Sequence, residues 1–200
     1  PEGQGPIRST TQGKEINLTR IAITPALALA LALSGARGQS AAATPFSLDS
    51  AASYLRVLAE EIGPRTMGSP AERRSMEFAL AKFRTFGLDE AYVLPMTTTS
   101  SSGRSLTITS SGTAVGILRG TNERIIVLGA HIDSATPEIP GANDDGSGCA
   151  VVLELARVLA QRQNQSTIVF TLFGGEEQGL RGSQHFVGHF ADIDKVVLML

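Results

Sequence analysis

Hydrophobic residues recur at helical spacing in two stretches near the start of the folded part of the chain. Residues 50–62 place apolar side chains three and four positions apart, and the Gly63-Pro64 pair ends the pattern. In the second stretch Ser69 suits an N-cap, Pro70 suits the first helical position, and the apolar stripe stops before Gly87. The spacing predicts two helices that pack on a sheet.

The next segment has the short apolar runs and turn residues that are typical of strands. Residues 91–94 and 105–109 predict two strands, and the Thr/Ser run at residues 97–102 predicts a polar loop between them, without chemistry of its own. Residues 116–118 suit a further short strand before a turn at residues 120–122.

A strand, helix, strand order follows. Residues 124–129 and 167–173 are apolar runs, and residues 148–161 form an amphipathic pattern between them. We expect four side chains of this helix to face inward: Val151, Leu155, Val158 and Leu159. Strands this apolar suit an α/β sheet that is covered on both faces, and the intervening helix favours parallel pairing with a right-handed crossover.

The N-terminal region differs from the rest. Residues 21–33 form an Ala/Leu run behind a basic flank, too short for the roughly 20 residues of a transmembrane helix but typical of a secretory signal. A buried helix is the alternative, which Pro25 disfavours. We therefore expect an extension at residues 1–45, a catalytic domain portion at residues 46–200, export to the periplasm or outside the cell, and no stable membrane span.

Composition narrows the function classes. The 200 residues are 42% hydrophobic and 18% charged, which excludes a disordered, collagenous or coiled-coil chain. A net charge of −2 gives no field that would attract nucleic acid or an anionic membrane. The single cysteine, Cys149, cannot close an intrachain disulfide or build a thiolate cage. Any metal ion must therefore be held by histidine and carboxylates.

Polar side chains follow both strands of the predicted unit and precede its helix. They comprise one histidine and five acidic residues: His131, Asp133, Asp144, Asp145, Glu176 and Glu177. Open sheets bind ligands beyond the carboxyl ends of their strands, so we expect these groups at one edge. Carboxylates at close range repel one another unless a cation neutralises them. The sequence therefore predicts a divalent metal site.

Ligand chemistry favours zinc, with cobalt or manganese also compatible. His131 would offer a neutral imidazole, while Asp144 and Glu177 would offer oxygens. Asp133 is placed to fix the orientation of the imidazole, as carboxylates near metal-bound histidines do. Of the adjacent pair Glu176 and Glu177, one can bind metal while the other serves as a general base.

Each of these groups also has a simpler explanation. Asp144-Asp145 could be an N-cap and turn, Glu176-Glu177 a solvated loop, and His131 a core histidine. Each simple explanation is acceptable for its own turn. It is improbable that all three hold at once, because the three turns all carry acids and glycine and all lie at the same edge of the sheet. His185 and His189 lie four apart but enclose no glutamate, so we interpret them as surface or packing residues. Cys149 is interpreted as a small buried side chain.

Three segments carry a resemblance to a known family. GAHIDS, PGANDDGSG and GGEEQGLRGS, in this order, resemble metallopeptidase family 28, which comprises secreted two-zinc aminopeptidases and their relatives. The resemblance extends from about Phe46 to the end of the chain and includes IGPRTMGSPAERR. It implies a three-layer α/β fold, in which a mixed, mainly parallel sheet lies between helices.

The resemblance also implies a role for each site residue. His131 matches a ligand of one zinc ion, Asp144 the carboxylate that bridges both ions, and Glu177 a ligand of the other. Glu176 matches the general base, and Asp133 the partner of the histidine. The family pattern contains a further Asp and a distant His, so the chain supplies three of five expected ligands. We expect these 200 residues, as a fragment, to bind zinc weakly and to hydrolyse nothing.

The function implied for an intact catalytic domain is that of an exported metallo-aminopeptidase acting on peptide substrates. Alternatives on the same fold are a glutaminyl cyclase, which would hold one zinc ion rather than two, and a carboxypeptidase or dipeptidase. A non-catalytic ectodomain that binds partners is an alternative of another class, disfavoured because His131, Asp144, Glu176 and Glu177 are all present. The sequence does not indicate the oligomeric state.

Overall fold

The computed structural model describes residues 44–102 and 105–200 of the chain. The predicted export segment at residues 21–33 lies outside these described residues. Within them, no helix combines the length and the hydropathy that are needed to cross a membrane.

A five-stranded mixed sheet forms the centre of the described part. The strands are β1 (Glu90–Ser102), β2 (Ser105–Leu118), β3 (Ile125–His131), β4 (Thr167–Phe173) and β5 (Val196–Met199), and their order is β1-β2-β4-β3-β5. β3 pairs in parallel with β4 and with β5, whereas β2 pairs antiparallel with β1 and β4. His131 and Phe173, the last residues of β3 and β4, stand opposite each other. The predicted parallel strand, helix, strand unit is confirmed.

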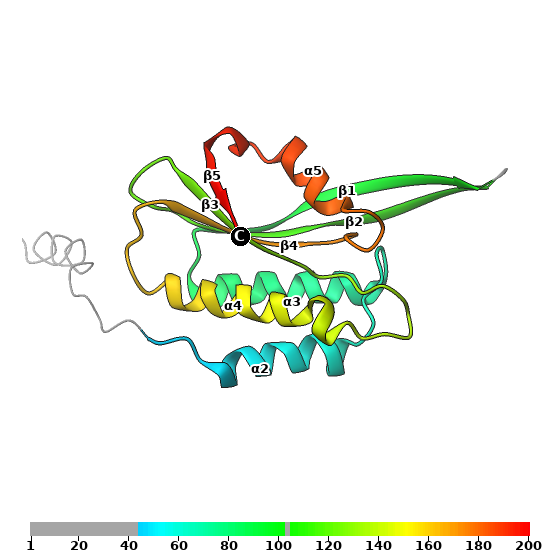
Figure 1. Ribbon diagram of the computed structural model, residues 1–200, viewed down its shortest axis with the longest axis horizontal. Helices are drawn as coiled ribbons and strands as arrows, with labels where there is room; N and C mark the ends of the chain where they lie inside the picture. The colour runs from blue at the N-terminus through cyan, green and yellow to red at the C-terminus, as the bar shows by residue number, and fades with distance from the viewer. Residues whose placement is uncertain (1–43, 103–104) are drawn as a thin grey trace, which may run out of the picture. The chain divides into compact units, whose positions relative to one another are not determined.

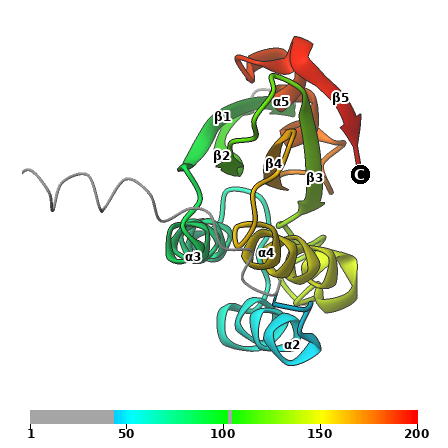
Figure 2. The same cartoon turned by 90° about the vertical axis from the view of Figure 1, so that its left-hand side faces the viewer.

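Helices cover both faces of the sheet. They are α2 (Leu48–Arg56), which continues as the π-helix η1 (Val57–Ile62), α3 (Pro70–Phe86), α4 (Ser147–Leu159) and α5 (Arg181–His189), with short turns η2 (Ala142–Gly146) and η3 (Ile193–Lys195). Figure 1 shows α3 and α4 side by side on one face, with α2 beyond them, and α5 on the opposite face. The view in Figure 2 confirms this layering. The predicted class, an α/β fold with a mixed sheet between helices, is confirmed.

The limits of α3 follow from the sequence signals that predicted them. The Ser69 hydroxyl accepts a hydrogen bond from the Glu72 amide at 3.0 Å, and Pro70 occupies the first turn, where a missing N–H costs nothing. Gly87 ends the helix in the left-handed conformation, with φ 81°. The apolar stripe of the helix packs into the core between the sheet and the helices α2 to α4.

The inward face of α4 differs from the predicted one. Val151 is 43% exposed, and the predicted stripe through Leu155, Val158 and Leu159 is only partly buried. The fully or nearly fully buried apolar side chains are Cys149, Ala150, Val152, Leu153 and Ala156. Apolar residues occupy more than half of the helix circumference, so helical spacing permits several stripes. Packing against both the sheet and α2 selects the one that is buried.

A long hairpin replaces the predicted short strands and polar loop. The Thr/Ser run at residues 97–102 belongs to β1, and β2 joins the two strands predicted at residues 105–109 and 116–118 into one. Threonine fits a pleated strand well, so the polar run forms a ribbon instead of a loop. Because β2 pairs with β4 only from Thr113 onward, the rest of the hairpin extends beyond the sheet (Figure 1).

Candidate metal centre

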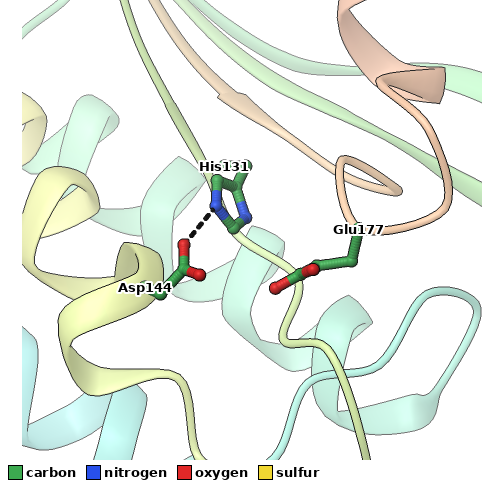
Figure 3. A group of neighbouring side chains, drawn as sticks. All are labelled: His131, Asp144 and Glu177. Carbon is green, nitrogen blue, oxygen red and sulfur yellow. Dashed lines mark hydrogen bonds and ion pairs between the residues drawn. The ribbon is translucent and has the colours of Figure 1, made fainter.

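The structure brings three of the predicted ligands together at the carboxyl edge of the parallel strands. His131 ends β3, Asp144 lies in η2 at the entrance to α4, and Glu177 lies in the turn after β4. Ligand atoms from these three side chains all lie within 4.8 Å of one another. Figure 3 shows the Asp144 and Glu177 carboxylates approaching the imidazole from different sides. One imidazole nitrogen and two carboxylates form a donor set that could hold a divalent metal ion.

Both nitrogens of His131 have carboxylate neighbours. Nε2 lies 2.9 Å from Asp144 Oδ1, and Nδ1 lies 3.2 Å from the Asp133 carbonyl oxygen and 3.6 Å from Asp133 Oδ1. Burial alone would lower the pKa of His131, but its hydrogen bonds to Asp133 and Asp144, together with the negative charges of Asp133 and Asp145, outweigh burial and raise the pKa to about 9. Because a metal ligand must be a neutral imidazole, binding of an ion would release the proton of His131.

Asp133 connects the histidine to the turn after β4. Its side chain is fully buried, and its two carboxylate oxygens accept hydrogen bonds from the amides of Glu176 and Glu177, at 3.0 and 3.2 Å. The same carboxylate faces His131 Nδ1. Asp133 therefore holds the imidazole and the two-glutamate turn in a fixed relation. The sequence predicted its contact with the histidine but not its contact with a turn 43 positions away.

The two adjacent glutamates occupy different positions at the edge. Glu177 belongs to the three-residue group, whereas Glu176 Oε2 lies 3.9 Å from His131 Nε2. Burial, followed by the negative charge of Asp144, raises the pKa of Glu177. The contribution of Asp144 agrees with the expectation that a neighbouring carboxylate disfavours the charged form of Glu177.

Asp144 and Asp145 are adjacent but have different roles. One acts as an N-cap, and the other joins the candidate metal centre. Asp145 caps α4, because its Oδ1 accepts a hydrogen bond from the Gly148 amide at 3.1 Å, and its Oδ2 accepts one from the His131 amide at 3.2 Å. The Asp144 side chain is 74% exposed and points toward the imidazole instead. The N-cap interpretation therefore describes Asp145, and Asp144 alone joins the candidate centre.

The turns that carry these acids depend on glycine. Gly141 has φ 58°, and a Cβ atom there would lie 2.6 Å from the Asp144 carbonyl oxygen. Gly175 has φ 70°, and a Cβ atom there would lie 2.8 Å from the sulfur of Met67. Both positions combine a left-handed backbone with close packing, so a side chain would displace the turn.

His185, His189 and Cys149 lie outside the three-residue group. The imidazole rings of His185 and His189 stack on α5 with centroids 3.9 Å apart, on the face of the sheet opposite α4. Cys149 is fully buried, its thiol lies 3.1 Å from the His131 carbonyl oxygen, and burial raises its pKa. These positions agree with the packing roles predicted for all three residues.

Two charged residues near the site, Arg65 and Glu72, are buried, which the sequence did not predict. Arg65 is fully buried below the loop that leads to Asp144. Glu72 accepts hydrogen bonds from the Gly68 amide at 2.6 Å and the Ser111 hydroxyl at 2.8 Å, and burial raises its pKa to about 7 despite both bonds. The Ser-x-x-Glu spacing from Ser69 is a capping-box signal that could have identified Glu72. No comparable signal identifies Arg65.

The fold and the cluster together define an α/β protein with a candidate metal centre at the carboxyl edge of its parallel strands. Residues 113–200 match the family described as Peptidase family M28. The chain is 42% identical over 92 residues to aminopeptidase YwaD of Bacillus subtilis, an alignment that covers 44% of this chain and 20% of the relative. It is 45% identical over 83 residues to a probable zinc metalloprotease of Leptosphaeria maculans, covering 37% of this chain and 19% of the relative. The matched region thus spans about a fifth of these relatives.

Solved structures share the fold. A zinc aminopeptidase from Bacillus subtilis superposes with a TM-score of 0.69 at 22% identity, covering 78% of this chain and 68% of that one. A glutaminyl cyclase from Porphyromonas gingivalis superposes with a TM-score of 0.60 at 28% identity, covering 72% of this chain and 54% of that one. Peptidases and cyclases therefore both share this architecture.

Proposed function

We propose that this chain forms part of a zinc-dependent aminopeptidase, which removes N-terminal residues from peptides. The observation that carries the proposal is the convergence of His131, Asp144 and Glu177 within 4.8 Å. The family match supports a hydrolase that cleaves peptides, and the names of the relatives include an aminopeptidase and a zinc metalloprotease. A nitrogen and carboxylate donor set suits zinc.

The roles of the chain's own residues follow from their positions. When bound, zinc supplies Lewis-acid chemistry that makes a water molecule acidic and polarises the scissile carbonyl. Glu176, 3.9 Å from His131 Nε2 and 35% exposed, accepts a proton from the attacking water and returns it to the leaving amine. Asp133 keeps the imidazole oriented and anchors the turn that presents Glu176.

We further propose two zinc ions for an intact catalytic domain, with Asp144 shared between them, His131 serving one ion and Glu177 the other. The family resemblance supports this assignment. The 200 residues supply matches for three of the five ligands that it implies. We therefore expect them alone to bind zinc weakly and to hydrolyse no peptide.

Zinc titration of paired histidine variants tests the metal centre. His131→Ala removes a proposed ligand, whereas His189→Ala removes a histidine on α5 outside the three-residue group. We expect isothermal titration with Zn²⁺ to show binding to the unmodified chain and to His189→Ala, but none to His131→Ala. Equal zinc binding by the two variants would contradict the proposed site.

A glutaminyl cyclase is the second candidate function, because a cyclase shares 28% identity with the chain at a TM-score of 0.60. Zinc stoichiometry and product separate the candidates in an intact catalytic domain carrying this chain. An aminopeptidase should hold two zinc ions and release a free amino acid from a leucyl anilide. A cyclase should hold one and convert an N-terminal glutamine to pyroglutamate.

Export is also proposed, on the basis of the apolar run at residues 21–33 behind its basic flank. Fusion of residues 1–45 to a reporter that is active only outside the cytoplasm tests it. We expect reporter activity from the fusion, and its loss when two leucines of the run are replaced by arginine. Equal activity from both fusions would refute a signal function.

A further inference from the structure

Arg65 lies fully buried near the candidate metal centre, and among the described residues its guanidinium donates hydrogen bonds only to backbone carbonyl groups. Nε donates to Ile132, the two N–H groups of Nη1 are shared among Leu58, Gly63 and Pro140, and Nη2 donates to Gly141. The donor to acceptor distances run from 2.6 to 3.2 Å.

Three of these acceptors, Ile132, Pro140 and Gly141, belong to the two segments that deliver His131 and Asp144, whereas Leu58 and Gly63 lie in η1 and at its end. Ile132 directly follows His131, and its carbonyl oxygen lies 2.8 Å from Arg65 Nε. The Pro140 and Gly141 carbonyl oxygens, at 2.6 and 3.0 Å from the guanidinium, begin the loop that carries Asp144. One side chain therefore spans both segments.

The backbone of Arg65 strengthens the first of these attachments. Its amide donates to Ser134 Oγ at 2.8 Å, and its carbonyl accepts from the Ser134 amide at 3.2 Å. Arg65 is thus joined to the segment after β3 by main-chain and side-chain bonds together.

The loop that carries Asp144 is closed at the point where Arg65 contacts it. The Gly141 carbonyl accepts from the Gly146 amide at 3.0 Å as well as from Arg65 Nη2. Asp144 lies inside the loop closed by this bond. A Cβ atom at Gly141 would lie 3.3 Å from Arg65 Nη2, so the loop and the guanidinium fit without spare room.

Stability alone does not account for a charged group at this position. A buried charge without an opposite charge in hydrogen-bonding distance costs free energy, and apolar side chains of similar volume are often as stabilising or more so. Burial lowers the pKa of Arg65, as expected for such a site. The planar guanidinium of arginine offers five N–H donors in fixed directions. A lysine has one compact ammonium group, which could not contact the same segments at once.

We propose that Arg65 is a positioning residue that sets the separation between His131 and Asp144 for binding a divalent cation. This inference rests on the proposed function, because it assigns Arg65 a role in that same site. Arg65 contacts neither the cation nor a substrate in this account. It acts through the backbone of residues 132 and 140–141.

The test is a Zn²⁺ titration of the 200-residue chain with Arg65→Lys, Arg65→Ala and a matched control. The control is Glu154→Gln, which alters another fully buried charged group, in α4 and away from the centre. Residues that orient metal ligands typically change metal affinity by about 10- to 100-fold. We expect a loss of this size in both Arg65 variants and unchanged zinc affinity in Glu154→Gln, even if all three melt at lower temperature.

Two further measurements separate positioning from loss of stability. Guanidinium ion at millimolar concentration should restore part of the zinc affinity of Arg65→Ala, because it can refill the vacated donor site. With Co²⁺ in place of zinc, the visible absorption spectrum should differ between Arg65→Lys and the unmodified chain, and should match between Glu154→Gln and the unmodified chain.

A milder variant covers the case in which the Arg65 substitutions do not fold. Ser134→Ala removes the hydroxyl that accepts from the Arg65 amide, a bond worth about 1 kcal/mol, and that also donates a long hydrogen bond to the Thr136 carbonyl at 3.4 Å. It should weaken zinc binding by up to about fivefold. If Arg65→Lys folds and its zinc affinity is unchanged, the role of Arg65 is wrong while the proposed function stands. If Arg65→Lys does not fold, an unchanged zinc affinity of Ser134→Ala has the same meaning. Absence of zinc binding by the unmodified chain would overturn the proposed function and this inference with it.

Discussion

Buried charge occurs in two regions of the molecule, and its partners differ between them. At the candidate centre, Arg65 and Asp133 are fully buried and bond mainly to backbone groups of other segments. In α4, Glu154 is fully buried too, but it pairs with Arg157 one turn away, at 2.5 and 2.8 Å, and accepts from the Ser47 amide. The first arrangement fixes turns relative to one another, whereas the second joins α4 to the start of α2. The comparison shows that burial of a charge does not by itself mark a site, because Glu154 is as buried as Arg65 and serves the junction between α4 and α2.

The largest effect is expected from Glu176→Gln, which removes the proposed proton acceptor at the edge. General acid–base groups contribute about 10²- to 10⁴-fold to rate. In an intact catalytic domain, kcat should fall by that factor while zinc content, measured by elemental analysis, stays unchanged. Retention of full turnover would remove Glu176 from the mechanism.

The next largest effect is expected from Asp133→Asn, which keeps the size of the side chain but removes its charge. Zinc affinity should fall by about 10- to 100-fold, because the amide orients His131 and the two-glutamate turn less well. Titration calorimetry with Zn²⁺ measures this loss. If Glu154→Gln lowered the affinity equally, the contrast between the two regions would be lost.

A pH-dependent effect of intermediate size is expected from Glu72. Its pKa is raised from an ordinary value of 4.5 to about 7, so the folded state binds this proton more tightly than the unfolded state. The contribution of Glu72 to stability is therefore most favourable below pH 4.5 and is lost as pH rises to about 7, by at most about 3 kcal/mol. Urea unfolding at several pH values measures it. Relative to the native chain, Glu72→Gln should gain stability across this window, and parallel curves would contradict the shift.

The smallest effect is expected from Glu154→Gln in the comparison region. Loss of charge-assisted bonds to Arg157 should destabilise the fold by about 2 kcal/mol, which a shift of the urea midpoint would show. Zinc affinity should not change. A variant that loses zinc affinity together with stability would show that the two regions are not independent.

The sequence predicted those features that depend on local spacing. The limits of α3 follow from Ser69, Pro70 and Gly87, and the position of His131 follows from its place at the end of an apolar run. The parallel unit then brings the acids to one edge, because the carboxyl ends of its strands meet there.

The remaining features depend on contacts between distant segments, which spacing does not encode. The contacts of Arg65 with Pro140 and Gly141 cross about 75 positions, and nothing near Arg65 in the sequence indicates them. The buried face of α4 is selected by its two neighbours in space, so Val151 was misassigned. The Thr/Ser run at residues 97–102 forms a strand because it finds a partner in β2.

The pairing of His131 with Phe173 shows that the register between β3 and β4 determines where the histidine lies relative to the turn after β4. Sliding one strand past the other by a single residue would move the histidine about 3.3 Å along the sheet and turn every side chain of the shifted strand to the opposite face. A deletion within either strand should therefore separate the imidazole from the glutamates of the following turn. Length changes in the part of the β1–β2 ribbon that precedes Thr113 in β2 should leave that alignment unchanged, because this part does not pair with β4.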